Sequence, residues 1–388
     1  MTFWFWFFVG PAIALAFLSL RGEKKRAHYV ESRLTPPDPP DGWPRVAVIV
    51  PVKGYDEGLR DNLASLAALD YPSYELIVTA RSAADIPPGV LPNGVKLVIG
   101  SENQAGASEK IQNLNAAIRL SLRSSTVLAF ADSDGKAPAG WLRALVSPLF
   151  EEGVGASTGY RWYLPTPPDF WSLVRSVWNA AIVSTLGPGD NPFAWGGAMA
   201  IRRDLFSELK IAQYWNLWVS DDYALAEAVH AAGLRIAFAP GAMVAATDHC
   251  TCYQFFAWAR RQMIITRVYH PQLWWTGLVA HVFYCGGMAA AVIASIMGNR
   301  LAEWALLVQL SPGMLKGTNR AVLAKAELPA YKIWFDRHGW VLTWWVPLAT
   351  WVWLLTLISA AFTDTIVWRG NRYKLTRDAQ DYDDSGLQ

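Results

Sequence analysis

The chain has 388 residues, of which 53% are apolar and 17% are charged, whereas about 25% charged is usual in soluble domains. This composition excludes intrinsic disorder and argues against a purely soluble protein. Because 34 Lys and Arg residues nearly balance 32 Asp and Glu residues, bulk charge gives no reason to expect a nucleic-acid partner.

The first predicted element is a transmembrane anchor at residues 1–22. Residues 3–20 are uncharged and apolar, and a helix of that length just crosses a hydrocarbon core of about 30 Å. Four cations follow within residues 21–26, and none precedes the run. A cleaved signal peptide would carry its charges first, so we expect an anchor that leaves the following segment in the cytoplasm.

A basic and proline-rich linker is expected at residues 23–44, and a different pattern begins at residue 45. Short β-branched runs alternate there with segments of helical spacing. This alternation predicts βαβ crossovers and a parallel sheet with both faces covered. The strands are expected at 45–52, 74–80, 96–100 and 126–132, and the helices at 57–69 and 109–122.

Polar residues follow three of these strands, at the edge where such sheets bind their ligands. Lys53 follows the first strand, Asp85 the second, and Asp132 with Asp134 the fourth. The two carboxylates of this Asp-Ser-Asp sequence offer hard oxygen ligands to Mg²⁺ or Mn²⁺ when a substrate diphosphate completes the coordination shell. The alternative is an ordinary turn, and the sheet context favours the metal site.

Asp221 and Asp222 open a helix in the segment 219–238. One aspartate suffices to cap a helix and to complement its dipole, so the second is left over. At the edge of a cleft, the remaining carboxylate can act as a general base on a hydroxyl group. Capping alone and capping with a catalytic base both stay open on this pattern.

Two further groups of polar residues admit two readings each. Lys110 and Asn113, on the expected helix at 109–122, could contact a phosphate or lie on a solvated helix face. Arg260, Arg261 and Arg267 precede an apolar helix. They could touch lipid headgroups, or one of them could neutralise charge on a leaving diphosphate.

The C-terminal part is expected to be a transmembrane region at 272–365 with a polar tail at 366–388. The apolar runs 273–298 and 340–362 each predict a spanning helix, whereas 301–311 could cross or lie at the interface. We expect 301–311 not to cross, because the tail has cations that favour the cytoplasm: Arg369, Arg372, Lys374 and Arg377. Residues 169–186 predict an interfacial helix or an ordinary packed one.

The order of these motifs resembles the family 2-type, inverting glycosyltransferases, and more narrowly the ceramide glucosyltransferase group with its bacterial relatives. The similar stretches run from about Arg45 to Leu375 and are VIVPVKGYDEGLRDNLASLAALDYPSYELIV, SEKIQNL, GASTGYRW, FAWGGAMAIRRDLF, SDDYALAEAVHAAGLRIAF, YQFFAWARRQ and WRGNRYKL. The fold that the resemblance implies is α/β, a GT-A (Rossmann-like) glycosyltransferase domain at 45–271 between N- and C-terminal transmembrane helices.

The resemblance also implies a UDP-sugar donor, usually UDP-glucose, a membrane lipid whose hydroxyl group accepts the sugar, and a divalent metal. By this similarity Asp222 is the catalytic base, and Asp132 with Asp134 holds the metal. The donor site is then formed by Lys53, Asp85, Lys110, Asn113, Asp132 and Arg261, with Asp85 at the uridine. The acceptor and sugar pocket is formed by Trp195, Gly197, Asp221 and Gln262.

One motif departs from the family pattern. The family has (Gln/Arg)-x-x-Arg-Trp, whereas this chain has Trp258 at the first position and Gln262 at the last, with Arg261 kept. A ceramide-type acceptor is expected first, with a hopanoid, a glycerolipid or another UDP-sugar as alternatives. A processive polysaccharide synthase and a non-catalytic nucleotide-sugar binder are less favoured. The resemblance implies an integral membrane protein of a bacterial inner membrane, with its catalytic domain in the cytoplasm.

Overall fold

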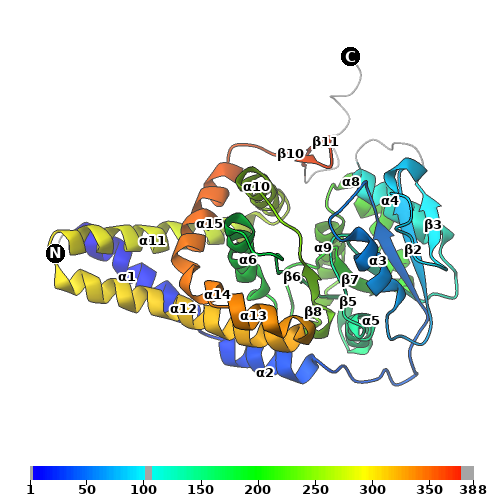
Figure 1. Ribbon diagram of the computed structural model, residues 1–388, viewed down its shortest axis with the longest axis horizontal. Helices are drawn as coiled ribbons and strands as arrows, with labels where there is room; N and C mark the ends of the chain where they lie inside the picture. Colours follow the sequence, from blue (N-terminus) through cyan, green and yellow to red (C-terminus); the bar gives the residue numbers. More distant parts are fainter. Residues whose placement is uncertain (1–2, 101–106, 377–388) are drawn as a thin grey trace, which may run out of the picture. The chain divides into compact units, whose positions relative to one another are not determined.

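The computed structural model describes residues 3–100 and 107–376 (Figure 1). The chain divides into two compact units. The helical unit comprises residues up to 28, 167–184 and 249–366, and the α/β unit comprises 29–166, 185–248 and the chain from 367. Within the expected domain at 45–271, residues 167–184 and 249–271 belong to the helical unit, and the bounds of that domain stay a prediction. The tail from residue 377, with the predicted cation Arg377, lies outside the described residues.

The α/β unit is built on a seven-stranded sheet with the order β3-β2-β1-β4-β7-β5-β8. The strands β3, β2, β1 and β4 are parallel neighbours, as the sequence predicts, whereas β7 runs antiparallel to β4 and β5. The β-branched and small residues of β1 and β4 are fully buried, which explains their continuous apolar runs. The bounds are β1 Val46–Pro51, β2 Tyr74–Ala80, β3 Lys96–Ile99, β4 Val127–Ala131, β5 Val154–Thr158, β7 Ala198–Arg202 and β8 Arg235–Phe238.

The predicted helices of this unit are confirmed. The leucines of α3 are buried, and α4 begins after Ser108, whose hydroxyl accepts a hydrogen bond from the Ile111 N–H. The helices are α3 Leu59–Ala67, α4 Glu109–Leu120, α5 Trp141–Val146, α7 Arg203–Glu208, α8 Ile211–Leu217 and α9 Asp221–Ala231. Two small sheets pair β6 Arg161–Tyr163 with β9 Val244–Ala246 and β10 Thr365–Trp368 with β11 Asn371–Lys374.

The helical unit contains the apolar segments. Its helices are α1 Phe3–Leu18, the start of α2 Glu23–Arg33, α6 Phe170–Val183, α10 Cys252–Tyr269, α11 Pro271–Ile296, α12 Arg300–Glu327, α13 Lys332–His338, α14 Val341–Trp344 and α15 Val346–Ala360. Two helical stretches among the described residues, Phe3–Arg33 and Pro271–Ile296, are long and apolar enough to cross a membrane. In Figure 1, α1, α11 and α12 run side by side, joined by a cluster that includes Val9, Ala291 and Ala302.

The structure gives the helix bounds within three of the expected terminal segments. Residues 301–311 are the start of the 28-residue α12, which continues past Lys316. The run 340–362 is divided at Trp345 into α14 and α15, and Pro347 lies in the first turn of α15. The first part of the expected linker at 23–44 is helical, because α2 covers residues 23–33.

Most apolar residues of α6 are buried, although Phe170 at its start is 51% exposed. The Trp178 ring stacks on Trp353 with 4.2 Å between centroids and meets Trp258 edge-on at 5.0 Å. The Trp353 indole N–H donates to the Trp178 carbonyl oxygen at 3.1 Å. Of the two readings for this helix, the contacts of Trp178 correspond to the packed one.

At Gly159 another backbone segment of the α/β unit leaves no room for a side chain. A Cβ at this position would lie 2.1 Å from the Ala242 carbonyl oxygen, and a backbone carbonyl cannot swing away as a side chain can. We expect Gly159→Ala to lower the free energy of unfolding by about 1–3 kcal/mol through overpacking. Thermal unfolding of the detergent-solubilised protein, followed by circular dichroism, measures the change.

The control is Gly140→Ala, because a Cβ at Gly140 meets nothing within 4 Å. This variant should stay within about 0.5 kcal/mol of the wild type. Equal stability of the two variants would contradict the close approach at Gly159.

Candidate active site

The loops after β1, β2 and β4 bring three of the predicted residues to one edge of the sheet. The Gly54 N–H donates to the Asp85 carbonyl oxygen at 2.9 Å, which ties the loop after β1 to the loop after β2. Asp132 and Asp134 follow β4 directly. The carboxylate of Asp85 accepts hydrogen bonds from the Ser82 backbone N–H at 3.0 Å and from the Ser82 hydroxyl at 3.2 Å.

A cation that the sequence analysis did not single out lies between the two metal-site candidates. Arg161, on β6, directs Nη1 to Asp134 Oδ2 at 2.8 Å and Nη2 to Asp132 Oδ2 at 3.0 Å. Its guanidinium lies 4.4 Å from the centre of the Trp195 ring, close enough for a cation–π contact. Burial would lower the pKa of Arg161, but the two carboxylates hold it well above its ordinary value.

Lys110 connects the loop after β4 to the start of α9. Its Nζ lies 3.1 Å from Asp132 Oδ1 and 3.0 Å from Asp221 Oδ2. Burial would lower the pKa of Lys110, and the surrounding carboxylates raise it well above its ordinary value instead. Burial raises the pKa of Asp221 to about 6; Lys110 opposes this rise, and the Asp222 and Asp132 carboxylates add to it.

The two aspartates at the start of α9 have different surroundings. Asp221 is 3% exposed and is held by Lys110. Asp222 is half-buried, and its carboxylate accepts hydrogen bonds from the Tyr223 N–H at 2.8 Å, from the Gly196 N–H at 3.3 Å and from the Ser220 hydroxyl. Asp222 is therefore the more accessible of the two carboxylates.

A pair of glycines allows these side chains to meet. A Cβ on Gly196 would lie 2.6 Å from Asp221 Oδ2 and 2.8 Å from Lys110 Nζ. A Cβ on Gly197 would lie 2.2 Å from the Trp195 ring and 2.7 Å from Asp132 Oδ2. The predicted residues Trp195 and Gly197 thus belong to the same site. We call the set of Lys110, Asp132, Asp134, Arg161, Asp221 and Asp222 the carboxylate network.

The carboxylate network has one oxygen suited to a metal ion. Asp134 Oδ1 is buried and accepts no hydrogen bond, whereas Asp134 Oδ2 and both oxygens of Asp132 contact Arg161 or Lys110. No group of three or more His, Cys, Asp or Glu side chains among the described residues could hold a metal ion. An ion such as Mg²⁺ or Mn²⁺ would here need both carboxylates together with oxygens from a substrate, because Asp132 and Asp134 offer it one free oxygen.

A second cluster lies around Lys53, whose Nζ is 2.6 Å from Glu109 Oε2. Asn371, on the β10–β11 hairpin, donates to the same Glu109 oxygen at 2.9 Å. Arg369 pairs with Asp56 Oδ1 at 2.5 Å and donates to the Lys53 carbonyl oxygen. Neither Glu109 nor Arg369 is among the site residues expected from the sequence, in which Arg369 is only a cation of the tail.

The remaining predicted residues lie in two places. Asn113, on α4, is 2% exposed, and its Oδ1 accepts no hydrogen bond. Arg261 and Gln262 lie on α10 in the helical unit, so their part in the predicted donor and acceptor sites stays a prediction.

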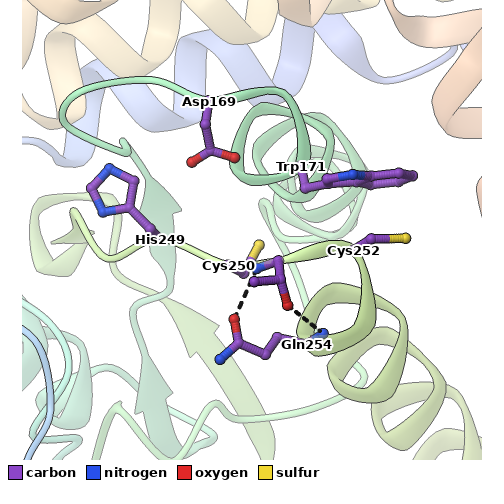
Figure 2. A pocket seen from close by; sticks show the side chains of 7 residues that line it. Asp169, Trp171, His249, Cys250, Cys252 and Gln254 are labelled. Carbon is purple, nitrogen blue, oxygen red and sulfur yellow. Dashed lines mark hydrogen bonds between the residues drawn. The ribbon is translucent and has the colours of Figure 1, made fainter.

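The helical unit has an open pocket of about 420 Å³ (Figure 2). Trp171, His249 and Cys252 line it, and Asp169 and Thr251 cap the helices α6 and α10 beside it. Figure 2 shows Gln254 bonded back to Thr251, with the amide oxygen accepting from the Thr251 N–H at 2.8 Å. None of the predicted site residues lines this pocket.

Comparison with known proteins gives one family and several structures. Residues 6–381 match the sequence model of glycosyl transferase family 21. The mannosyltransferase PcManGT from Pyrobaculum calidifontis, in complex with GDP-Man and Mn²⁺, has a TM-score of 0.52 at 19% identity, over 91% of this chain and 97% of that chain. Glucosyl-3-phosphoglycerate synthase from Mycobacterium tuberculosis, in complex with phosphoglyceric acid, has a TM-score of 0.39 at 17% identity, over 58% of this chain and 79% of that chain, which is too low to bear on the fold. The α/β unit has the GT-A glycosyltransferase fold.

Lys110 gives a testable electrostatic prediction. Replacing it leaves Asp221 and Asp132 without their shared cation, which should cost about 3–5 kcal/mol of unfolding free energy for Lys110→Gln at pH 8. The pKa of Asp221, already raised to about 6, should rise further without Lys110. Because a raised carboxyl pKa stabilises the fold at low pH and loses this effect as pH rises, the loss should be much smaller at pH 5.

Chemical unfolding in detergent at the two pH values measures this difference. Lys96→Gln is the matched control, since Lys96 is exposed and donates to the Leu120 carbonyl oxygen, and it should change stability little at either pH. An equal loss for Lys110→Gln at pH 5 and pH 8 would contradict the shared-cation role.

Proposed function

We propose that this chain, a member of glycosyl transferase family 21, transfers a hexose from a UDP-sugar to a hydroxyl group of a membrane lipid. The family makes the protein a sugar-nucleotide-dependent glycosyltransferase. Glucose is the expected sugar and a ceramide-type lipid the expected acceptor, with hopanoid and glycerolipid acceptors or another UDP-sugar as alternatives.

The placement of Asp222 carries the proposal for the chemical step. Asp222 is the half-buried member of the carboxylate network at the start of α9, and the backbone N–H groups of Gly196 and Tyr223 orient its carboxylate. A carboxylate that substrate can reach is able to take the proton of an acceptor hydroxyl. Asp221 is a poorer base, because it is almost fully buried and paired with Lys110.

The proposed step is a single displacement. The acceptor oxygen loses its proton to Asp222 and forms a bond to the anomeric carbon of the sugar. The bond between that carbon and the diphosphate breaks, and the electron pair leaves with UDP. Attack opposite to the leaving group inverts the configuration at the anomeric carbon. Lys110 and Arg161, the two cations of the carboxylate network, lie next to Asp132 and Asp134 and would offset charge on a diphosphate that departs there.

A divalent metal is proposed at Asp132 and Asp134. The free oxygen Asp134 Oδ1 supports this assignment, as does the Mn²⁺ bound in the PcManGT complex. When bound, such an ion supplies positive charge to a leaving diphosphate. Asp85 and Lys53, on neighbouring loops, are proposed to contact the nucleotide, and Asn113 and Arg261 to complete the donor site.

The lipid acceptor is proposed from the apolar helices. A lipid with long acyl chains stays in the bilayer, so an enzyme that glycosylates it has to work at the membrane surface. The apolar stretches Phe3–Arg33 and Pro271–Ile296 would attach the chain there. We place Trp195, Gly197, Asp221 and Gln262 in the sugar and acceptor pocket, and the catalytic unit in the cytoplasm of a bacterium.

Substitution of Asp222 tests the base. Asp222→Asn should lower turnover by about 10²–10⁴-fold, because the amide cannot accept the hydroxyl proton. UDP affinity should change little. Asp204→Asn is a matched control, because Asp204 also lies in the first turn of a helix and is exposed. Near-normal turnover of Asp222→Asn, measured as UDP release with lipid present, would refute the assignment.

The substrates are tested by incubating the purified full chain with a panel of UDP-sugars and bacterial lipid extracts, followed by mass spectrometry of the lipids. A lipid heavier by one hexose is the expected product. Chelation with EDTA should weaken UDP binding, and Mg²⁺ or Mn²⁺ should restore it. If the enzyme only hydrolyses the UDP-sugar and no lipid in the extracts gains a hexose, the proposed lipid acceptor is wrong.

A further inference from the structure

Arg161 holds the oxygens that the proposed metal would need. Its guanidinium nitrogen Nη2 lies 3.0 Å from Asp132 Oδ2, and Nη1 lies 2.8 Å from Asp134 Oδ2. Lys110 contacts the other carboxylate oxygen of Asp132. Of the four oxygens of these two carboxylates, Asp134 Oδ1 is the one left without a partner among residues 3–100 and 107–376. One oxygen is a weak site for Mg²⁺ or Mn²⁺, which take about six oxygen ligands.

Two aromatic rings lie close enough to hold the Arg161 side chain after its guanidinium has left the carboxylates. Its guanidinium lies 4.4 Å from the centre of the Trp195 ring and 5.4 Å from the centre of the Tyr163 ring. The planar guanidinium pairs with phosphate oxygens in the same two-pronged way as with carboxylates. A diphosphate that enters next to Asp132 therefore offers Arg161 an equivalent partner, and the aromatic rings keep the side chain in place.

Charge favours such an exchange over simple addition. The carboxylate network contains four aspartates and two cations, Lys110 and Arg161, and its side chains are largely buried. A divalent cation added while Arg161 stays would meet the guanidinium at close range. When the divalent cation binds together with an anionic diphosphate, Arg161 pairs with the diphosphate instead. The cation then meets carboxylates without a guanidinium beside them.

We propose that Arg161 is a resident counter-cation, which occupies the metal-binding carboxylates in the absence of donor and makes metal and nucleotide diphosphate bind cooperatively. This inference rests on the metal site of the proposed function and assigns Arg161 a positioning role. It also implies reciprocity: the factor by which the diphosphate tightens metal binding equals the factor by which metal tightens diphosphate binding.

The test measures Mn²⁺ binding to the full-length protein in detergent by electron paramagnetic resonance of free Mn²⁺, without nucleotide and with saturating UDP. Wild type should bind Mn²⁺ weakly alone and at least about tenfold more tightly with UDP. Arg161→Gln should bind Mn²⁺ at least about tenfold more tightly than wild type when UDP is absent, and should gain less from UDP. Loss of folding could not produce this result, since a disordered site would bind more weakly.

Two further variants complete the comparison. Arg161→Lys keeps the charge but has no fork, so its affinity for Mn²⁺ without UDP should fall between wild type and Arg161→Gln. Arg235→Gln removes an arginine that pairs with Glu151 at 3.0 Å and is absent from the carboxylate network, and it should match wild type.

The outcomes separate the two proposals. If Arg161→Gln and wild type bind Mn²⁺ equally without UDP, the counter-cation role is wrong and the metal site stands. Suppose that UDP leaves the Mn²⁺ affinity of wild type unchanged and that Arg161→Gln binds Mn²⁺ tightly without UDP. Arg161 then competes with the metal for the carboxylates, but the coupling to UDP is wrong. If neither protein binds Mn²⁺ even with UDP, the metal site and the inference fall together.

Discussion

The site depends on the cost of burying several carboxylates in one place. Among the residues that the structure describes, Asp132, Asp134 and Asp221 form ion pairs with two cations, and each cation pairs with two carboxylates. Lys110 bridges Asp132, in the loop after β4, and Asp221, on α9. Arg161 bridges the two aspartates of the Asp-Ser-Asp sequence. An uncompensated buried charge costs more than most single contacts contribute, so this sharing of cations fixes how the strand ends, α4, β6 and α9 meet.

Much of the α/β unit could be predicted from local patterns. The strands β1 and β4 are buried on both faces, so their β-branched runs are continuous, and aspartates directly after a strand must reach its carboxyl edge. For the same reason, the sequence placed Asp85 and Asp132 at one edge of the sheet. The helix starting at Asp221 followed from its cap pattern, although the pattern could not tell which aspartate is the accessible one.

The residues that were missed take part in pairings over long sequence distances. Arg161 lies 27 residues after Asp134, and Glu109 meets Asn371 across 262 residues, so neither contact leaves a local pattern. The antiparallel β7 was missed because the parallel neighbours dominate the alternation of strands and helices. The break before α15 was readable in principle, since Pro347 favours a helix start and disfavours a helix interior.

The β10–β11 hairpin joins the end of the described chain to its first strands. Arg369 and Gly370 have φ values of 49° and 83°, as a two-residue hairpin turn requires, and Arg369 and Asn371 then contact Asp56 and Glu109. During translation, Asp56 and Glu109 are synthesised long before their partners Arg369 and Asn371. The ribosome releases the loop after β1 and the start of α4 early, but their contacts with Arg369 and Asn371 form only after the helices α11, α12 and α15 have been synthesised. This edge of the α/β unit is therefore completed last, after the apolar helices of the chain.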